Sequence, residues 1–183
     1  MSEKKAWTLS VLVEDTPGVM SQVARLFSRK GYNIESIAAG PADRPGETRI
    51  SVVTIGDEKM INQIATQLSK LLLVISVDIL TSENSIQREL ALIKVSAETR
   101  DQRDAVLQII NVFRASVLDM GRESMTVAVL GDAEKIKAIL NLLDDFGILE
   151  VVRSGMIALQ RGHGTIYDRT RIKEEYNYGK NVL

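Results

Sequence analysis

The residues best suited to bind a small molecule form the stretch Glu-Asp-Thr-Pro-Gly at positions 14–18. Apolar residues follow at spacings of three and four through Phe27, a pattern typical of an amphipathic helix. Thr16 is a good N-cap residue, Pro17 suits the first helical position, and Gly31 suits a left-handed stop. The sequence therefore predicts a helix that begins at Pro17 and ends before Gly31.

Two interpretations of this stretch follow from the residues alone. A helix N-terminus offers unpaired N–H groups and a positive dipole end, and both favour a carboxylate or another small anion. Gly18 has no Cβ, so a ligand could approach the backbone closely. Asn33, just after the helix, can both donate and accept hydrogen bonds. The stretch is either a capped helix with a glycine stop or a ligand site.

Residues for covalent or metal chemistry are scarce. The 183 residues contain no cysteine, and His163, the one histidine, stands in a polar segment. The sequence has no metalloprotease His-Glu-x-x-His motif and no P-loop. We therefore predict no catalytic residues, no metal ligands and no bound cofactor in this chain.

Periodicity divides the first eighty residues into six elements. We expect strands at 9–13, 34–39, 49–55 and 72–80, with the helix of residues 17–30 after the first strand and a second helix after Gly56-Asp57. The order is β-α-β-β-α-β, the split βαβ arrangement. The second strand would lie at an edge of the sheet, where it could pair with a second copy of the chain.

The second half repeats this order. We expect strands at 90–95, 115–119, 124–130 and 148–159, the last one bent at Gly155, with two helices between them. The sequence GDEKMINQIATQL at Gly56 resembles GDAEKIKAILNLL at Gly131. The predicted fold class is α+β, with two tandem ferredoxin-like units at 1–80 and 88–161, a linker at 81–87 and a polar tail at 162–183. For the tail we expect disorder.

Composition narrows the classes of partner. Acidic and basic residues nearly cancel, leaving a formal charge of −1, so no broad basic surface for nucleic acid is expected. RNA-binding modules of this topology stack bases on aromatic residues of the central strands, and the expected strands at 9–13, 49–55 and 124–130 contain none. No apolar run reaches membrane-spanning length and no secretory leader is visible, so we expect a cytoplasmic protein.

Several separated motifs resemble one family. The stretch from Glu14 to Lys30, GYNIESI at Gly31, RELALIKV at Arg88 and VVRSGMIALQRG at Val151 are similar to the regulatory small subunits of acetolactate synthase (acetohydroxyacid synthase). The similarity runs from about Trp7 to Gly162, and several motifs in order are more specific than any one of them.

The resemblance implies an N-terminal ACT domain at 1–80 and a second ferredoxin-like domain. It implies a homodimer that binds a branched-chain amino acid, most often valine, between two ACT domains. The partner would be the catalytic subunit, which holds thiamine diphosphate, Mg²⁺ and FAD. The small subunit would be non-catalytic. It would raise the activity of that partner and transmit feedback inhibition in valine, leucine and isoleucine biosynthesis.

The family's effector site corresponds here to two short segments. They comprise Asp15, Thr16, Pro17, Gly18, Val19, Met20, Asn33 and Ile34. Many members carry asparagine where Asp15 stands, and an aspartate can accept from an ammonium but cannot donate to a carboxylate. The alternative function is a free-standing ACT-type amino-acid sensor that acts on another enzyme.

Overall fold

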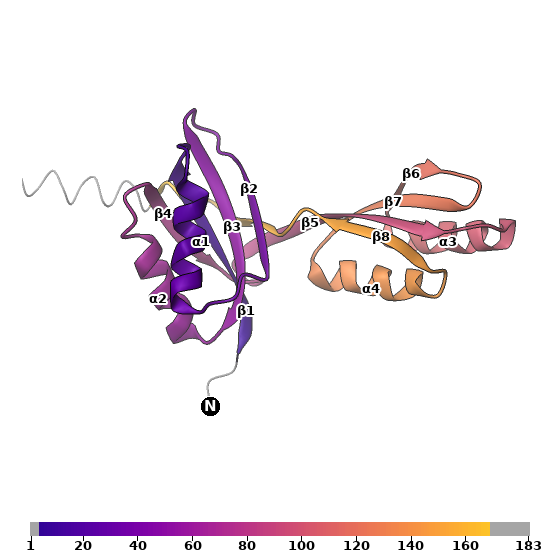
Figure 1. Ribbon diagram of the computed structural model, residues 1–183, viewed down its shortest axis with the longest axis horizontal. Helices are drawn as coiled ribbons and strands as arrows, with labels where there is room; N and C mark the ends of the chain where they lie inside the picture. Colours follow the sequence, from indigo (N-terminus) through magenta and orange to yellow (C-terminus); the bar gives the residue numbers. More distant parts are fainter. Residues whose placement is uncertain (1–3, 169–183) are drawn as a thin grey trace, which may run out of the picture. The chain divides into compact units, whose positions relative to one another are not determined.

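The computed structural model describes residues 4–168 and divides them into two compact units. Residues 4–86 and 156–168 form the first unit, and residues 87–155 form the second. The first unit contains β1 (Lys5–Glu14), α1 (Val19–Lys30), β2 (Ser36–Pro41), β3 (Glu47–Gly56), α2 (Glu58–Leu68) and β4 (Val74–Leu80). Its sheet is antiparallel, in the order β2-β3-β1-β4 (Figure 1). β2 is therefore an edge strand, as predicted.

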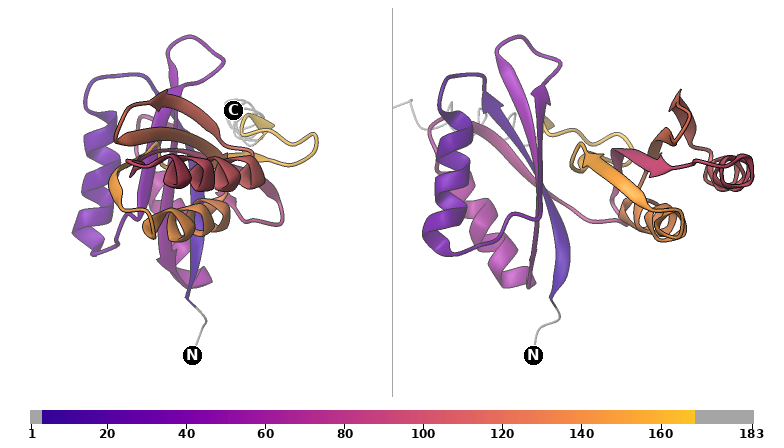
Figure 2. Two further views of the ribbon diagram at one scale, coloured as in Figure 1. Left: turned by 90° about the vertical axis from the view of Figure 1, so that its right-hand side faces the viewer. Right: turned by 45° about the vertical axis from the view of Figure 1, so that its right-hand side comes forward.

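Both helices of the first unit cover the same face of this sheet (Figure 2). Alternate residues of the central strand β1, Leu9 and Val11 among them, join the apolar core beneath these helices. Val23 and Phe27 of α1 and Ile61 of α2 enter the same core. Burying one such side chain contributes roughly 1.5–3 kcal/mol, so this layer holds α1 against the sheet.

The second unit repeats the arrangement. It contains β5 (Ser85–Ser96), α3 (Arg100–Phe113), β6 (Ser116–Met120), β7 (Ser124–Gly131), α4 (Ala133–Asp144) and β8 (Ile148–Arg153). The strand order is β6-β7-β5-β8, again antiparallel. The structure confirms the predicted α+β class with two ferredoxin-like units, and the expected strands at 115–119 and 124–130 pair as a hairpin. The predicted strand at 90–95 is longer than expected and begins at Ser85 within the predicted linker.

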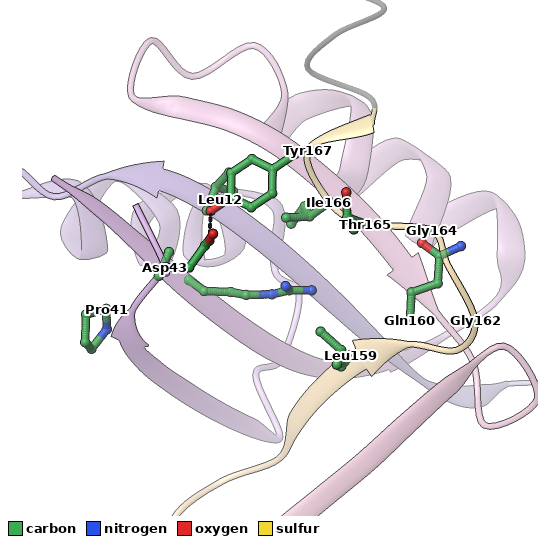
Figure 3. Close-up of a pocket in the computed structure, with 12 residues that line it drawn as sticks. Leu12, Pro41, Asp43, Leu159, Gln160, Gly162, Gly164, Thr165, Ile166 and Tyr167 are labelled. Carbon is green, nitrogen blue, oxygen red and sulfur yellow. Dashed lines mark hydrogen bonds between the residues drawn. The ribbon is translucent and has the colours of Figure 1, made fainter. Parts of the chain in front are cut away.

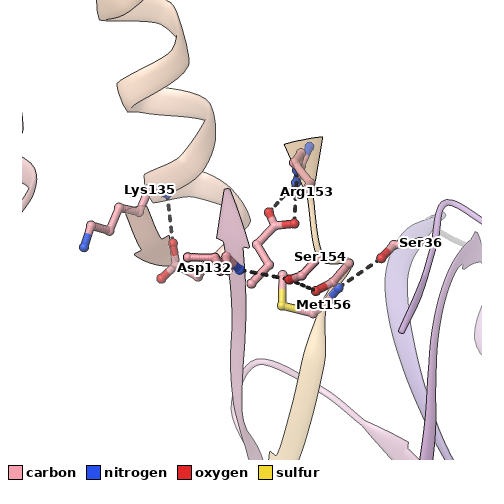
Figure 4. A network of polar contacts seen from close by, with 9 residues as sticks. Ser36, Asp132, Lys135, Arg153, Ser154 and Met156 are labelled. Carbon is pink, nitrogen blue, oxygen red and sulfur yellow. Dashed lines mark hydrogen bonds and ion pairs between the residues drawn. The ribbon is translucent and has the colours of Figure 1, made fainter. Parts of the chain in front are cut away.

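Two polar contacts join β5 to the end of β8 in the second unit, one made by Arg153 and one by Ser154 (Figure 4). Arg153 Nε donates to Glu89 Oε2 at 3.0 Å, and its Nη2 donates to the other carboxylate oxygen. The Glu89 side chain is only 2% exposed, so this ion pair neutralises a buried carboxylate. Ser154 Oγ accepts the Leu90 N–H at 3.0 Å.

The predicted helix start is wrong. α1 begins at Val19, and its N-cap is Gly18 at φ 90°, ψ −5°, without a capping side chain. Thr16 therefore does not cap the helix, and Pro17 precedes it. The Val19 N–H donates to Thr16 O at 3.3 Å, so residues 16–19 form a turn. Proline followed by glycine at positive φ is the combination that a type II turn requires, and this turn signal outweighs the capping signal.

The C-terminal segment also differs from expectation. After β8 the chain turns at Gly155, and β9 (Ile157–Gln160) belongs to the first unit instead of extending the preceding strand. Ile166, in the predicted polar tail, is only 2% exposed. A segment with few apolar residues can still be held by one buried side chain, which periodicity does not reveal. Residues 169–183 of that tail lie outside the described residues, and the predicted domain limits stay predictions.

Candidate effector site

The loop after β1 is held against the hairpin that joins β2 and β3. Asp15 donates its N–H to Gly46 O at 2.8 Å, and Thr16 donates its N–H to Glu14 O at 2.9 Å. Asp15, Pro17 and Gly18 are exposed. The loop backbone is therefore fixed while its outer surface remains accessible to a ligand.

The N-terminus of α1 has no capping side chain, whereas the other three helices of the described residues have one. Asp57 accepts from Met60 N, Thr99 from Gln102 N, and Asp132 from Lys135 N. At α1 the N-cap is a glycine, which has no side chain to offer. The first N–H groups of a helix lack intrahelical partners, so the start of α1 can donate to an anion.

Two further features of the loop suit a ligand. The Thr16 hydroxyl oxygen is buried without a hydrogen-bond partner, and an unpaired buried polar group is destabilising. A Cβ built on Gly18 would meet no atom within 4 Å, so open space lies over this part of the backbone. An incoming carboxylate could occupy the open space over Gly18.

The apolar members of the predicted site face different surroundings. Val19 is 5% exposed and belongs to the core of the first unit, so it supports the helix and has little surface left for a ligand. Met20 is 37% exposed beside it, and Ile34 is half-buried against the same core. Met20 and Ile34 are therefore the apolar groups that a ligand side chain could contact.

Asn33 lies in the exposed connection between α1 and β2. Its Nδ2 donates to Glu35 Oε1 at 2.6 Å, and its carbonyl accepts from Thr54 Oγ1 at 2.7 Å. The carbonyl contact fixes the backbone to β3, while the amide is held only by an exposed side chain. Asn33 can therefore exchange its amide partner for a ligand without disturbing the sheet.

One chain does not bring the predicted residues together. Asp15 to Met20 lie at the start of α1, and Asn33 and Ile34 follow its end. The helix has 12 residues, so about 18 Å of helix separates the two groups. The strand register also places the two groups at opposite ends of the sheet. Glu14, just before the first group, pairs with Glu47 at one end, and Ser36, just after the second group, pairs with Val53 towards the other end.

The sequence did not reveal the residues that support the two segments. Gly46, recognised only as part of a turn, holds Asp15 through its carbonyl across 31 positions. Glu35 and Thr54 hold Asn33. Only the Pro-Gly pair at 17–18 carried a signal that could have identified the turn.

Within residues 4–168 no three histidine, cysteine, aspartate or glutamate side chains gather as a metal site. Among the same residues, no helix is both long and apolar enough to cross a membrane. His163 is an exposed turn residue.

Comparison with known families gives two matches. Residues 88–162 match the family described as small subunit of acetolactate synthase. Residues 9–76 match the family described as AHAS small subunit-like ACT domain. Together the two matches span most of the chain.

Individual relatives agree with these matches. An acetolactate synthase small subunit of Mycobacterium leprae is 48% identical over 155 residues, which is 85% of this chain and 91% of the relative. A probable acetolactate synthase small subunit of Methanothermobacter thermautotrophicus is 42% identical over 158 residues, 86% of this chain and 94% of the relative. The crystal structure of the acetolactate synthase small subunit from Thermotoga maritima has a TM-score of 0.80 at 36% identity. That match covers 87% of this chain and 99% of the other.

Proposed function

The chain belongs to the family of acetolactate synthase small subunits, and we propose that it confers feedback inhibition by a branched-chain amino acid, most often valine. In the same complex it raises the activity of the catalytic subunit. The proposed effector residues are those of the loop and first helical residues from Asp15 to Met20, together with Asn33 and Ile34.

The uncapped start of α1 carries this proposal. Its N–H groups and the Thr16 hydroxyl lack protein partners of the kind that cap the other helices. An α-carboxylate supplies such a partner, since charged acceptors form stronger hydrogen bonds than neutral ones. Met20 and Ile34 offer apolar surface to the branched side chain.

A homodimer would complete the site. β2 is an edge strand, and an antiparallel pair of β2 strands about a twofold axis places the start of one strand beside the end of the other. In one chain the C-terminal end of β2 lies at the same end of the sheet as the effector loop. Asn33 of the partner subunit would therefore approach the loop of the first chain, which removes the 18 Å separation.

The catalytic chemistry belongs to the partner in this proposal. The catalytic subunit would hold thiamine diphosphate, Mg²⁺ and FAD and would form acetolactate, while this chain contributes no catalytic residue. The chain would act by shifting the equilibrium between active and inhibited conformations of the complex, which requires that valine bind the two with different affinity.

Reconstitution tests the proposal. The full chain is mixed with the acetolactate synthase catalytic subunit, and acetolactate formation is measured with and without valine. We expect the chain to raise the rate and valine to lower it again. Valine binding without any change in the rate would instead favour a free-standing sensor that acts on another enzyme.

A further inference from the structure

A second candidate site lies on the face of the first sheet that α1 and α2 leave uncovered. Ser10 and Leu12 of β1 alternate with the core residues of that strand and therefore point to this face. Here the chain forms a half-open cavity of about 520 Å³ (Figure 3). This volume falls within the range of small-molecule sites.

Residues from the end of the described chain line this cavity. Leu159 of β9 lines one wall, and Ile166 and Tyr167 line another. The Tyr167 hydroxyl lies within hydrogen-bond distance of Asp43 and, at 3.0 Å, of Glu47 Oε2. The Arg44 guanidinium stacks over the Tyr167 ring at 4.0 Å from its centroid. This segment is thus attached to the β2–β3 hairpin.

A guanidinium lines the cavity on the sheet side. Arg49 Nε donates to Ser10 Oγ at 2.7 Å, and Ser10 is fully buried, so the head group is held in one orientation. Burial lowers the pKa of Arg49, while Asp78, Tyr167 and Asp43 act in the opposite direction. Arg49 remains half-buried and lines the open space, where a planar guanidinium can bind a carboxylate through two N–H groups.

A carboxylate lines the same cavity. The Tyr167 hydroxyl has a single proton, and Asp43 and Glu47 both approach it. The hydroxyl can donate to only one of them at a time, so the pair of carboxylates retains capacity for a further donor. Asp43 lines the cavity and can therefore accept from an ammonium group.

We propose that this cavity binds an α-amino acid with an apolar side chain, its carboxylate on Arg49 and its ammonium on Asp43. Leu12, Leu159 and Ile166 provide apolar walls for the side chain. The charges around the cavity nearly compensate, with Arg49 and Arg44 opposed by Asp43, Glu47 and Asp78. Such a set favours a zwitterion over a phosphate, whose extra negative charge the carboxylates would repel.

This site differs from the proposed effector site in place and in composition. All of its residues belong to the first unit of a single chain, so it needs no second copy. Asp43 shares a turn with Gly46, whose carbonyl holds Asp15 of the effector loop. A ligand on Asp43 would therefore contact the hairpin that supports that loop.

Calorimetry on the full chain tests the proposal with L-valine, L-leucine and L-isoleucine as probes. In a Gly18→Asp background, which obstructs the proposed effector site, at least one probe should still bind with one equivalent per chain. Adding Arg49→Gln should weaken that binding at least tenfold. Arg25→Gln, at an exposed arginine of α1, is the matched control and should change nothing.

Two analogues test the polarity of the site. 4-Methylpentanoate is leucine without its ammonium group, and Asp43→Asn should bring the affinity for leucine down to that for the analogue. Arg49→Gln should weaken both, and 3-methylbutylamine, which lacks the carboxylate, should be insensitive to it. Thermal melting confirms that each variant is folded.

Two outcomes would overturn the proposal: no residual binding in the Gly18→Asp chain, or residual binding that Arg49→Gln leaves unchanged. The effector proposal fails on a different measurement. It is wrong if valine still inhibits the enzyme reconstituted with the Gly18→Asp chain.

Discussion

Gly18 is the residue on which the effector site depends most directly. Its φ of 90° strains any L-residue, and the space above it is open. We expect Gly18→Asp to remove feedback inhibition, because its carboxylate would lie a few ångströms from that of valine and repel it by several kcal/mol. Gly18→Ala carries the same strain without the charge and should retain most of the inhibition. Valine titration of the reconstituted enzyme checks both, and full inhibition of the aspartate variant would contradict the site.

Asn33 provides a second test at the residue scale. If its amide bonds the effector of the neighbouring subunit, Asn33→Ala leaves a polar ligand group unsatisfied, which costs about 1–3 kcal/mol. Valine affinity should fall roughly five- to 150-fold, while activation of the catalytic subunit persists.

The alternative role of Asn33 is local, since its amide donates to Glu35. Glu35→Gln is the matched control, because it weakens that contact and leaves the amide in place. Melting temperature and valine titration are measured on one preparation. A lowered melting temperature with an unchanged valine response would assign Asn33 to local stability.

At the scale of the elements, the join between the end of β8 and the start of β5 depends on one buried charge. Arg153→Ala would leave the Glu89 carboxylate buried without its cation, and we expect a loss of about 3–5 kcal/mol. The Lys94–Glu150 pair on the same strands is largely exposed at 3.7 Å, so Lys94→Ala should cost little. Urea unfolding of both variants checks this, and equal losses would show that burial does not distinguish the two pairs.

The C-terminal segment gives a pH-dependent prediction at the same scale. Burial, followed by the contacts with Asp43 and Glu47, raises the pKa of Tyr167 above its ordinary value of 10. The neutral phenol is thus favoured in the folded state. The contribution of Tyr167 to the stability of the folded state is complete below the pKa that this phenol has in the unfolded chain. That contribution declines as the pH rises above about 10.

Tyr167→Phe measures this contribution, because it removes the hydroxyl and keeps the ring beneath Arg44. We expect the variant to be less stable by about 1 kcal/mol at pH 8 and the difference to shrink above pH 10. Urea unfolding at several pH values checks the trend. A difference that grows with pH would contradict the proposed contact.

Helix capping shows which features of the fold can be predicted from neighbouring residues alone. Gly-Asp at positions 56–57 and 131–132 predicts helix starts, and in both cases the aspartate caps the helix. The cap works through residues three positions apart, so the sequence contains all of it. At α1 two local signals compete, and the Pro-Gly turn outweighs the threonine cap.

The C-terminal segment changes how the first unit must be isolated. We expect effector binding to need only this unit, since all proposed ligand groups lie within it. A chain that ends at Thr81 would lack β9 and Ile166, and the buried isoleucine alone contributes roughly 1.5–3 kcal/mol. Joining Ile86 to Met156 through a short glycine-rich linker keeps that segment.

We expect the joined chain to bind valine like the full chain and to melt at a higher temperature than the chain that ends at Thr81. Calorimetry and thermal melting check both statements. Loss of valine binding in a folded, dimeric joined chain would show that the second unit takes part in effector binding.

Local patterns along the chain were enough to establish the α+β class, the order of elements as far as β8, the glycine stop of α1 and the family. These features depend on local periodicity, on capping and turn residues, and on motifs that stay in order along the chain. The sequence also placed the proposed effector residues around the start of the first helix and at the entry to β2.

Which distant residues lie side by side follows only from the three-dimensional fold. The fold returned Met156–Tyr167 to the first unit. It also brought Arg49, Asp43 and Tyr167 to one cavity, although Tyr167 is 124 positions from Asp43. Such contacts form because a sheet face must be covered and a buried charge must find a partner, and neither requirement leaves a periodic pattern in the sequence.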